Sequence, residues 1–213
     1  AHTPVDVLQQ NFDLPAASIG KLPSRELFIF PAPVPPSLAQ DRSAIGGEKV
    51  ASRVDYTFNI SAMQPTRVTP GGEVRIVDTR LFPASTTIAA ALVTLRPGGL
   101  RELHWHPTGP EWQFYLSGSA RMTVFVPANR ARTMDFNAND VGFVPAMAGH
   151  YIQNTGSTDL VFLEILRSSQ FVDFSLNQWL RRLPPEIVAA HLNLNSADLA
   201  HIPADKTVIR PRP

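Results

Sequence analysis

The sequence contains no cysteine among its 213 residues. A disulfide framework and a thiolate metal site are both excluded, because each needs cysteine sulfur. No uninterrupted apolar run reaches the roughly 18 residues that span a bilayer as a helix, so we expect no membrane partner. The opening residues A-H-T-P-V-D show neither the charged nor the apolar region of a signal peptide. Localisation is therefore open between the cytoplasm and a secreted or cell-wall setting, and only the latter would let the sequon at Asn59 carry a glycan.

An excess of charge of one sign is also absent. The chain has 19 lysine and arginine residues against 18 aspartate and glutamate residues, a formal net charge of +1 and an isoelectric point near 8.4. No cluster of basic residues forms the stripe that follows a phosphate backbone. We therefore expect no nucleic-acid partner.

The 20 prolines and the 44% hydrophobic content favour a β-fold with many short connections and one sizeable core. Segments rich in β-branched and aromatic residues recur between turn signals, as in a sandwich or barrel. We expect a helical arm and proline-rich connector over residues 1–47, a β-barrel over 48–170, and helices with a tail over 171–213. Strands are expected at Tyr56–Ile60, Glu73–Asp78, Thr86–Leu95, Leu103–His106, Glu111–Leu116, Ala120–Val126, Arg132–Phe136, Val141–Val144, Tyr151–Asn154 and Leu160–Leu166.

Short helices are expected on both sides of the barrel in the chain. Thr3 is expected to cap a first helix that ends near Phe12. The stretch P-A-P-V-P-P and the residues after it, through Gly47, indicate an extended connector. The residues from Pro203 onward are expected to form an exposed arm. Further helices are expected at Ala16–Gly20, Leu176–Arg181, Pro185–Leu192 and Ser196–Ala200, the last of them capped by Ser196.

The most informative stretch is G-G-L-R-E-L-H-W-H-P-T-G-P-E-W-Q-F-Y-L-S-G, read together with the later His150. His104 and His106 are separated by one residue, so on a β-strand their imidazoles lie on the same face and can share one ligand. The segment P-T-G-P predicts a bend between two strands. Such a hairpin returns Glu111 towards the two imidazoles.

Three imidazole nitrogens and one carboxylate oxygen suit a divalent first-row cation, Mn2+ or Fe2+, with octahedral coordination and open positions. Zinc fits less well, because it prefers a closed tetrahedral set when structural and three ligands plus water when catalytic. Paired histidines on a strand also occur as surface or core residues. The combination of His104 and His106 with Glu111 and His150 favours the metal site.

The spacing G-x5-H-x-H-x4-E-x6-G resembles the first motif of the cupin superfamily. Here it is formed by Gly98, His104, His106, Glu111 and Gly118. The segment D-V-G-F-V-P-A-M-A-G-H, which ends at His150, resembles the second motif. Asn139 and Met147 stand where that motif usually has glycine. The resemblance implies an all-β cupin fold, a double-stranded β-helix or jelly-roll barrel with short helices flanking it in the chain.

A closer resemblance is to the second half of bicupin oxalate decarboxylases. It is carried by R-E-L-H-W-H-P, A-R-M-T-V-F, D-V-G-F-V-P and S-L-N-Q-W-L, and it covers nearly the whole chain. In a full bicupin the proline-rich stretch would join the two halves, so we expect the chain to be a cleaved or truncated second half. The expected protein partners are the missing first cupin domain or further copies of this chain, in a trimer or hexamer.

Two further side chains are candidates for catalysis. Glu164 lies in V-F-L-E-I-L, where burial without a partner would cost several kcal/mol. A buried Glu164 should be paired or raised in pKa, and the alternative is that it is turned to solvent. Counting by twos from His104 places Glu102, not Arg101, on the ligand face. The resemblance instead places Arg101 beside the substrate, and a bulge at Gly98-Gly99 would reset the alternation.

The resemblance implies a manganese enzyme that converts oxalate to formate and carbon dioxide, with dioxygen as co-catalyst or co-substrate. Arg101 would hold a substrate carboxylate and Glu164 would return a proton. Without that proton donor the outcome is oxalate oxidase, which gives carbon dioxide and hydrogen peroxide. Phe171 stands where relatives often have a tyrosine, which indicates reduced activity. The alternative from another class is a non-catalytic metal-binding cupin.

Overall fold

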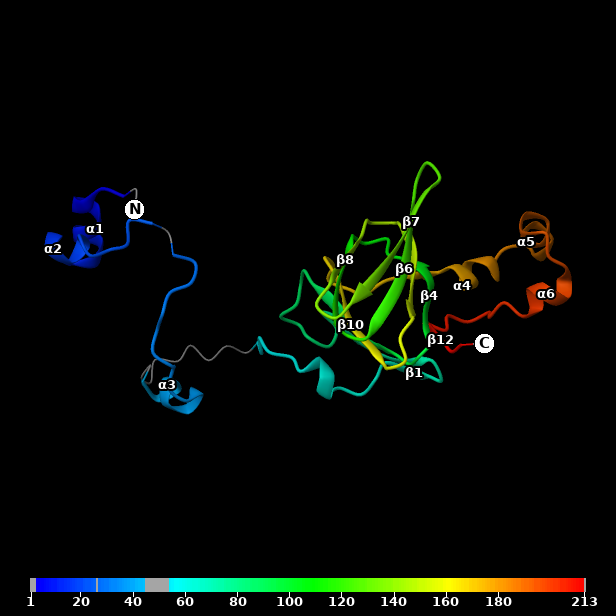
Figure 1. Cartoon of the computed structure of the whole chain (residues 1–213), viewed down its shortest axis with the longest axis horizontal. Coiled ribbons are helices and arrows are strands. Elements are labelled where there is room, and N and C mark those ends of the chain that lie inside the picture. The colour runs from blue at the N-terminus through cyan, green and yellow to red at the C-terminus, as the bar shows by residue number, and fades with distance from the viewer. Residues whose placement is uncertain (1–2, 26, 45–53, 213) are drawn as a thin grey trace. The chain divides into compact units, whose positions relative to one another are not determined.

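The computed structural model describes residues 3–25, 27–44 and 54–212. The chain separates into two compact units, Ala1–Ala51 and Ser52–Pro213. In the part of the chain that is described, no helix is both long and apolar enough to cross a membrane. Figure 1 draws the elements of both units, and each unit is described on its own.

In its described residues the first unit contains three helices: α1 (Val5–Phe12), α2 (Ala16–Ile19) and α3 (Leu38–Ala44). The expected cap by Thr3 is wrong, because α1 begins after Pro4 with no side-chain cap bond. Helix α3 corrects the expectation of a wholly extended connector. Ser37 and Gln40 form a reciprocal capping box there, each side chain accepting from the other's backbone N–H. The end of the expected connector, residues 45–47, lies outside the described residues.

The second unit is built on two six-stranded sheets in which all pairs are antiparallel. One sheet consists of β1 (Arg67–Thr69), β2 (Gly72–Val77), β3 (Ala89–Leu95), β10 (Leu160–Leu166), β5 (Glu111–Ser117) and β8 (Val141–Val144), in that order. The other consists of β11 (Phe174–Ser175), β4 (Leu100–Trp105), β9 (Gly149–Asn154), β6 (Ser119–Val126) and β7 (Arg130–Asn137), with β12 (Ile209–Arg210) also paired to β4. The expected all-β class is confirmed.

The core follows from strand alternation. Every second residue of β3 and of β10 is fully buried, as expected where side chains point alternately to the two faces of a sheet. The ring of Tyr115 is stacked on Phe136 and Phe162, with ring centroids 4.7 and 5.5 Å away. These contacts join side chains from both sheets into one core.

The two departures from the second cupin motif occupy unusual backbone conformations. Asn139 has a φ of 73° and Met147 a φ of 64°, in the left-handed region that favours glycine. Asparagine tolerates this region, whereas methionine is strained there. The glycine preference at these positions therefore has a backbone cause.

Nine of the ten expected strands correspond to β2 through β10. The expected strand at Tyr56–Ile60 is wrong. Residues 54–59 form no strand, and a short 3-10 helix, η1 (Ile60–Ala62), follows them. The Asn59 side chain accepts a hydrogen bond from the Ala62 N–H and so begins that turn. Strands β1, β11 and β12 were not expected, because two or three residues carry no readable alternation.

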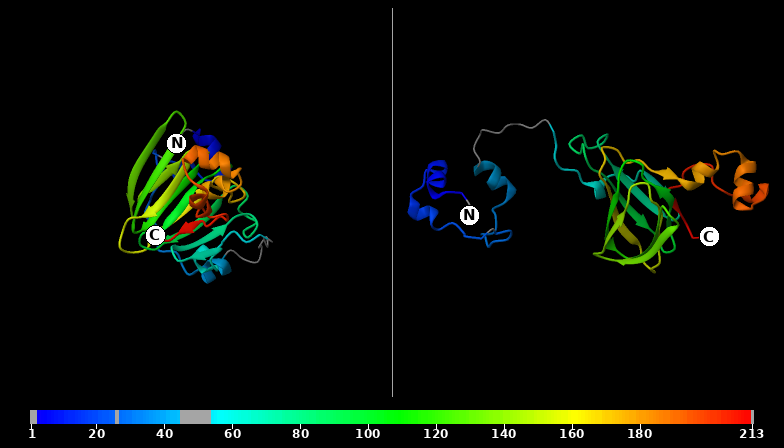
Figure 2. Two further views of the ribbon diagram at one scale, coloured as in Figure 1. Left: turned by 90° about the vertical axis from the view of Figure 1, so that its right-hand side faces the viewer. Right: turned by 90° about the horizontal axis from the view of Figure 1, so that it is seen from above.

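After the barrel the chain forms α4 (Leu176–Leu180), α5 (Pro185–Leu192) and α6 (Ser196–Ala200). These helices lie beside one end of the barrel (Figures 1 and 2). The cap of α6 is Asn195 rather than Ser196, in a capping box with Asp198. The expectation of an exposed C-terminal arm is also wrong in part, because Val208 and Ile209 are buried and β12 pairs with β4.

Candidate metal centre

Four potential ligands come together between the two sheets. His104 lies on β4, His106 just after it, Glu111 begins β5 and His150 lies on β9. The antiparallel register of β4 and β9 places His104 opposite His150. One ligand atom from each of the four lies within 4.8 Å of the others, and all four residues are buried.

The backbone orients each imidazole. Because a neutral imidazole donates from one ring nitrogen and accepts at the other, an Nδ1–H bonded to a carbonyl leaves the Nε2 lone pair free. In all three histidines Nδ1 has a carbonyl partner and the buried Nε2 has no hydrogen-bond partner. The carbonyls are those of Glu102 for His104 at 2.6 Å, Val172 for His106 at 2.8 Å and Ala148 for His150 at 3.0 Å.

The Glu111 carboxylate presents one oxygen to this cluster. Its Oε1 accepts a hydrogen bond from Nε2 of Gln113 at 2.6 Å, and Oε1 of Gln113 accepts from the Tyr115 hydroxyl at 2.6 Å. Its Oε2 lies 2.7 Å from Nε2 of His106 and 3.2 Å from Nε2 of His150. With neutral imidazoles these are contacts between lone pairs, so a cation among them would remove the repulsion.

For two of the four residues, His104 and Glu111, electrostatics favour the form that binds a cation. At His106 the effect of burial is outweighed by the Glu111 carboxylate, which raises the pKa of that ring. Burial and the nearby Arg101 guanidinium lower the pKa of His104 well below its ordinary value, which keeps the ring neutral. Burial opposes ionisation of Glu111, but His150 and His106 outweigh it and lower the pKa of that carboxyl. Nitrogen and oxygen donors of this kind suit manganese or iron. The residues present therefore fit a divalent cation.

Arg101 reaches the ligand side through a bulge. The pairing of β4 with β9 shifts register between Arg101 and His104, and the consecutive residues Arg101 and Glu102 are both 1% exposed. Glu102 turns to the C-terminal tail, where its carboxylate accepts from the Val208 N–H and the Thr207 hydroxyl. A bulge therefore changes which residues of β4 face the ligand cluster, as expected. The bulge, however, lies after Arg101 and not at Gly98-Gly99.

Glu164 is fully buried on β10, so the alternative in which it faces solvent is wrong. Its Oε1 accepts from Nε of Arg101 at 3.1 Å. Burial raises its pKa, and Glu111 adds to the rise against the opposing effect of Arg101. Two buried polar atoms of this pair, Nη1 of Arg101 and Oε2 of Glu164, have no hydrogen-bond partner. A donor and an acceptor are thus left for a small polar ligand.

The segment after β10 also builds the centre, and the sequence reasoning missed most of it. The Phe171 ring meets His106 edge-on with centroids 5.4 Å apart. Asp173 accepts from Nη2 of Arg101 at 2.7 Å and pairs with Lys206 of the tail. No periodicity or motif signals these contacts, because they join residues far apart in the chain.

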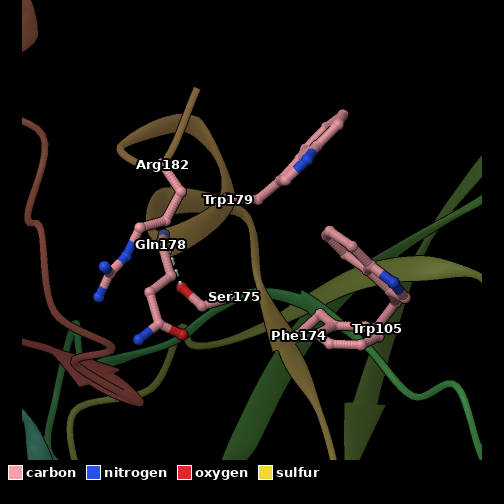
Figure 3. Close-up of a pocket in the computed structure, with 6 residues that line it drawn as sticks. All are labelled: Trp105, Phe174, Ser175, Gln178, Trp179 and Arg182. Atoms are coloured by element: carbon pink, nitrogen blue, oxygen red, sulfur yellow. Dashed lines mark hydrogen bonds between the residues drawn. The ribbon is translucent and has the colours of Figure 1, made fainter. Parts of the chain in front are cut away.

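The opposite face of β4 carries an aromatic cleft of about 520 Å³. Trp105 follows His104 and therefore points away from the ligands. It packs against Phe174 and Trp179, with ring centroids 5.7 and 6.1 Å away. Figure 3 shows the two indoles on one side of the cleft, with Gln178 and Arg182 on the other. The cleft is separate from the four ligands.

Comparison with known proteins agrees with this geometry. The sequence model of the family described as Cupin matches residues 58–199. The chain is 46% identical over 194 residues to oxalate decarboxylase OxdC of Bacillus subtilis (strain 168), covering 91% of this chain and 50% of that protein. It is 39% identical over 211 residues to a probable oxalate decarboxylase of Arthroderma benhamiae, covering 98% and 51%.

Solved structures give the same result. The structure of B. subtilis oxalate decarboxylase at pH 4.6 matches with a TM-score of 0.85 and 42% identity, covering 100% of this chain and 55% of that one. A second structure of that enzyme, from work on its Mn(II) centers, has the same TM-score, identity and coverage. The chain spans about half the length of these relatives. Because the family model matches residues 58–199 and the fold has two antiparallel sheets, the chain belongs to the cupin family.

Proposed function

We propose that this cupin holds manganese(II) through His104, His106, Glu111 and His150 and converts oxalate to formate and carbon dioxide. The observation that carries the proposal is the convergence of three imidazole nitrogens and one carboxylate oxygen with no polar partner, beside a buried arginine. The relatives named as oxalate decarboxylases, one studied for its Mn(II) centers, support the choice of metal and substrate.

A bound manganese ion supplies positive charge and one-electron redox chemistry, with dioxygen as the co-catalyst. The protein's part is to hold the substrate and move a proton. One carboxylate of oxalate would face the metal site. The Nη1 of Arg101, which has no hydrogen-bond partner within the protein, would donate to the other carboxylate. In the balanced reaction, hydrogen oxalate gives formate and carbon dioxide, so one C–C bond breaks and one C–H bond forms.

Glu164 is the proton carrier in this proposal. Burial raises its pKa, which favours the protonated carboxyl more than in an ordinary glutamate. It lies within hydrogen-bond distance of Arg101, so substrate held by Arg101 also lies near this carboxyl. Glu164 would protonate carbon to form formate, and the proton released by hydrogen oxalate would restore its carboxyl.

The second candidate function is oxalate oxidase. The observation that favours it is the ion pair of Glu164 with Arg101 at 3.1 Å, because an ionised Glu164 has no proton to give. Phe171 also carries no hydroxyl that would steady a protonated Glu164. In that case oxalic acid and dioxygen yield two carbon dioxide molecules and hydrogen peroxide.

One assay separates these functions. Manganese-loaded protein is incubated with oxalate at acid pH, and formate, peroxide and carbon dioxide are measured together. Formate supports the decarboxylase, and peroxide without formate supports the oxidase. Neither product, with manganese bound, indicates the non-catalytic metal-binding cupin. The Arg101→Ala variant, loaded with metal to the same extent, controls for oxalate breakdown by free manganese.

We also propose that the chain works with a further cupin domain, either a separate first half or another copy of itself. The support is that the relatives are about twice as long. Light scattering during size-exclusion chromatography gives the number of copies. A monomer with full activity would contradict this part of the proposal.

A further inference from the structure

We infer that Asp173 is the residue that positions Arg101 for the substrate, and that Lys206 of the C-terminal tail in turn positions Asp173. The inference rests on the proposed function in treating Arg101 as the group that holds oxalate. Neither Asp173 nor Lys206 belongs to the four-ligand cluster. Their contribution would be to fix the direction of one guanidinium group.

The guanidinium of Arg101 is held on two edges. Its Nε donates to Glu164 Oε1 at 3.1 Å, and its Nη2 donates to Asp173 Oδ2 at 2.7 Å. A planar fork held at two nitrogens has no remaining rotation. The third nitrogen, Nη1, is buried and without a hydrogen-bond partner. Asp173 therefore decides where that last donor points.

Lys206 holds the other oxygen of Asp173. Its Nζ bonds to Asp173 Oδ1 and lies 3.4 Å from the Asp173 carbonyl oxygen. The Asp173 side chain is 4% exposed and that of Lys206 is 26% exposed, so the cation covers the carboxylate from the solvent side. Burial acts against ionisation of Asp173, but Arg101 and Lys206 outweigh it and lower its pKa to about 2.

The tail residues after Lys206 are anchored to the strand that carries Arg101. Thr207 and Val208 donate to the Glu102 carboxylate, and the Glu102 N–H donates to the Val208 carbonyl at 3.0 Å. Strand β12 then pairs Ile209 with Arg101. The tail thus reaches Arg101 both through its backbone and through Asp173. The tail, which was expected to be a solvated arm, therefore contacts the residues that hold Arg101 in place.

Charge balance gives the reason for both residues. Arg101 and Lys206 carry two positive charges, and the negative charge of Asp173 lies between them and contacts both. Without the Asp173 charge, Arg101 would be drawn to Glu164 alone and turn its donors away from an incoming carboxylate. Without Lys206, Asp173 would keep one unpaired oxygen and hold Arg101 less firmly.

The test compares Asp173→Asn, Lys206→Met and Lys206→Arg in the manganese-loaded full chain. Oxalate affinity is measured without turnover, from the change in the manganese EPR spectrum under anaerobic conditions. We expect Asp173→Asn to weaken oxalate binding by about tenfold or more, the size of a hydrogen bond to a charged group. Lys206→Met should lie between wild type and Asp173→Asn, and Lys206→Arg near wild type. Manganese content should be unchanged in all three.

The matched control is Asp135→Asn. It removes an ion pair of similar length, Arg121 Nε to Asp135 Oδ1 at 2.7 Å, but on the exposed surface. Its oxalate affinity should equal that of wild type. If Asp173→Asn fails to fold, Lys206→Met carries the test, because it leaves the buried Arg101–Asp173 contact in place.

A second readout does not depend on oxalate. The Nη2–H of Arg101, which donates to Asp173, should give a slowly exchanging signal in the 15N–1H spectrum of the metal-free protein, assigned from its loss in Arg101→Ala. Its exchange should accelerate by about tenfold or more in Asp173→Asn. If wild-type protein binds no oxalate, the proposed function fails while this exchange still decides the role of Asp173. Wild-type exchange in Asp173→Asn, or unchanged oxalate affinity despite faster exchange, would overturn the inference.

Discussion

The hydroxyl of Tyr115 donates to Oε1 of Gln113 over 2.6 Å, and this bond decides which end of the Gln113 amide faces Glu111. An amide whose oxygen is taken by Tyr115 can only present its NH2 group to the carboxylate. Glu111 therefore gives Oε1 to Gln113 and keeps Oε2 for the imidazoles. The core ring stack of Tyr115 is in this way connected to the candidate metal centre.

Gln113→Ala should weaken manganese binding by about 10- to 100-fold, the usual effect of losing a group that orients a ligand. Without the amide, Oε1 of Glu111 is buried with no donor, and the carboxylate can rotate. The measurement is a competition titration of Mn2+ against a chelator. Gln153→Ala, on the exposed side of β9, is the control. Equal affinities of Gln113→Ala and wild type would contradict the assigned role.

Glu164→Gln should lower formate production by about 100-fold or more, in line with loss of a general acid. The amide keeps the shape and a hydrogen bond to Arg101 but has no carboxyl proton to give. Manganese content should stay at the wild-type level, since Glu164 is not among the four clustered ligands. The measurement is formate by NMR beside peroxide by a coupled assay, with Glu73→Gln as control. Wild-type formate yield from Glu164→Gln would exclude this carboxyl as the donor.

The folded state should lose stability in acid as the Asp78 carboxylate becomes protonated. Hydrogen bonds from Arg80, against the opposing effect of burial, and a further one from the Phe171 N–H lower its pKa to about 2 from 3.8. A lowered pKa contributes stability above the unfolded value, and that contribution is lost as pH falls from about 4 to about 2.

The measurement is urea unfolding of metal-free protein between about pH 5 and about pH 1, a range that extends about one unit beyond each end of the transition. Asp78→Asn should lose stability at pH 5 but show a shallower decline in acid, because it lacks this titration. The exposed Asp135→Asn serves as the control. Parallel pH profiles for Asp78→Asn and wild type would rule out this linkage.

Met147→Gly should raise the free energy of unfolding by about 1 kcal/mol. The residue has a φ of 64°, where a side chain with a Cβ is strained, and it is 60% exposed, so little packing is lost. Asn139→Gly is the matched control at a φ of 73°. Asparagine tolerates this conformation, so its gain should be smaller. A destabilised Met147→Gly would mean that contacts of the methionine side chain outweigh the strain.

Local sequence patterns were sufficient to predict most of the longer strands of the barrel. Long alternating strands such as β3 and β10 were expected close to their observed bounds, because alternation reports directly which face is buried. Short strands were not: β11 and β12 are held by pairing with β4, and two residues cannot show a period. Ser37 and Gln40 did carry a readable capping signal, which the proline-rich context obscured.

By itself the sequence determined the four clustered side chains, since a strand period of two and a turn bring His104, His106 and Glu111 together and a motif adds His150. Only the tertiary structure decided that Arg101 faces them, because a bulge after it reverses the alternation of β4. It also decided the partners of Arg101. Glu164 and Asp173 lie 63 and 72 residues away in the chain, and contacts at such separation arise from sheet packing and the returning tail rather than from any local pattern.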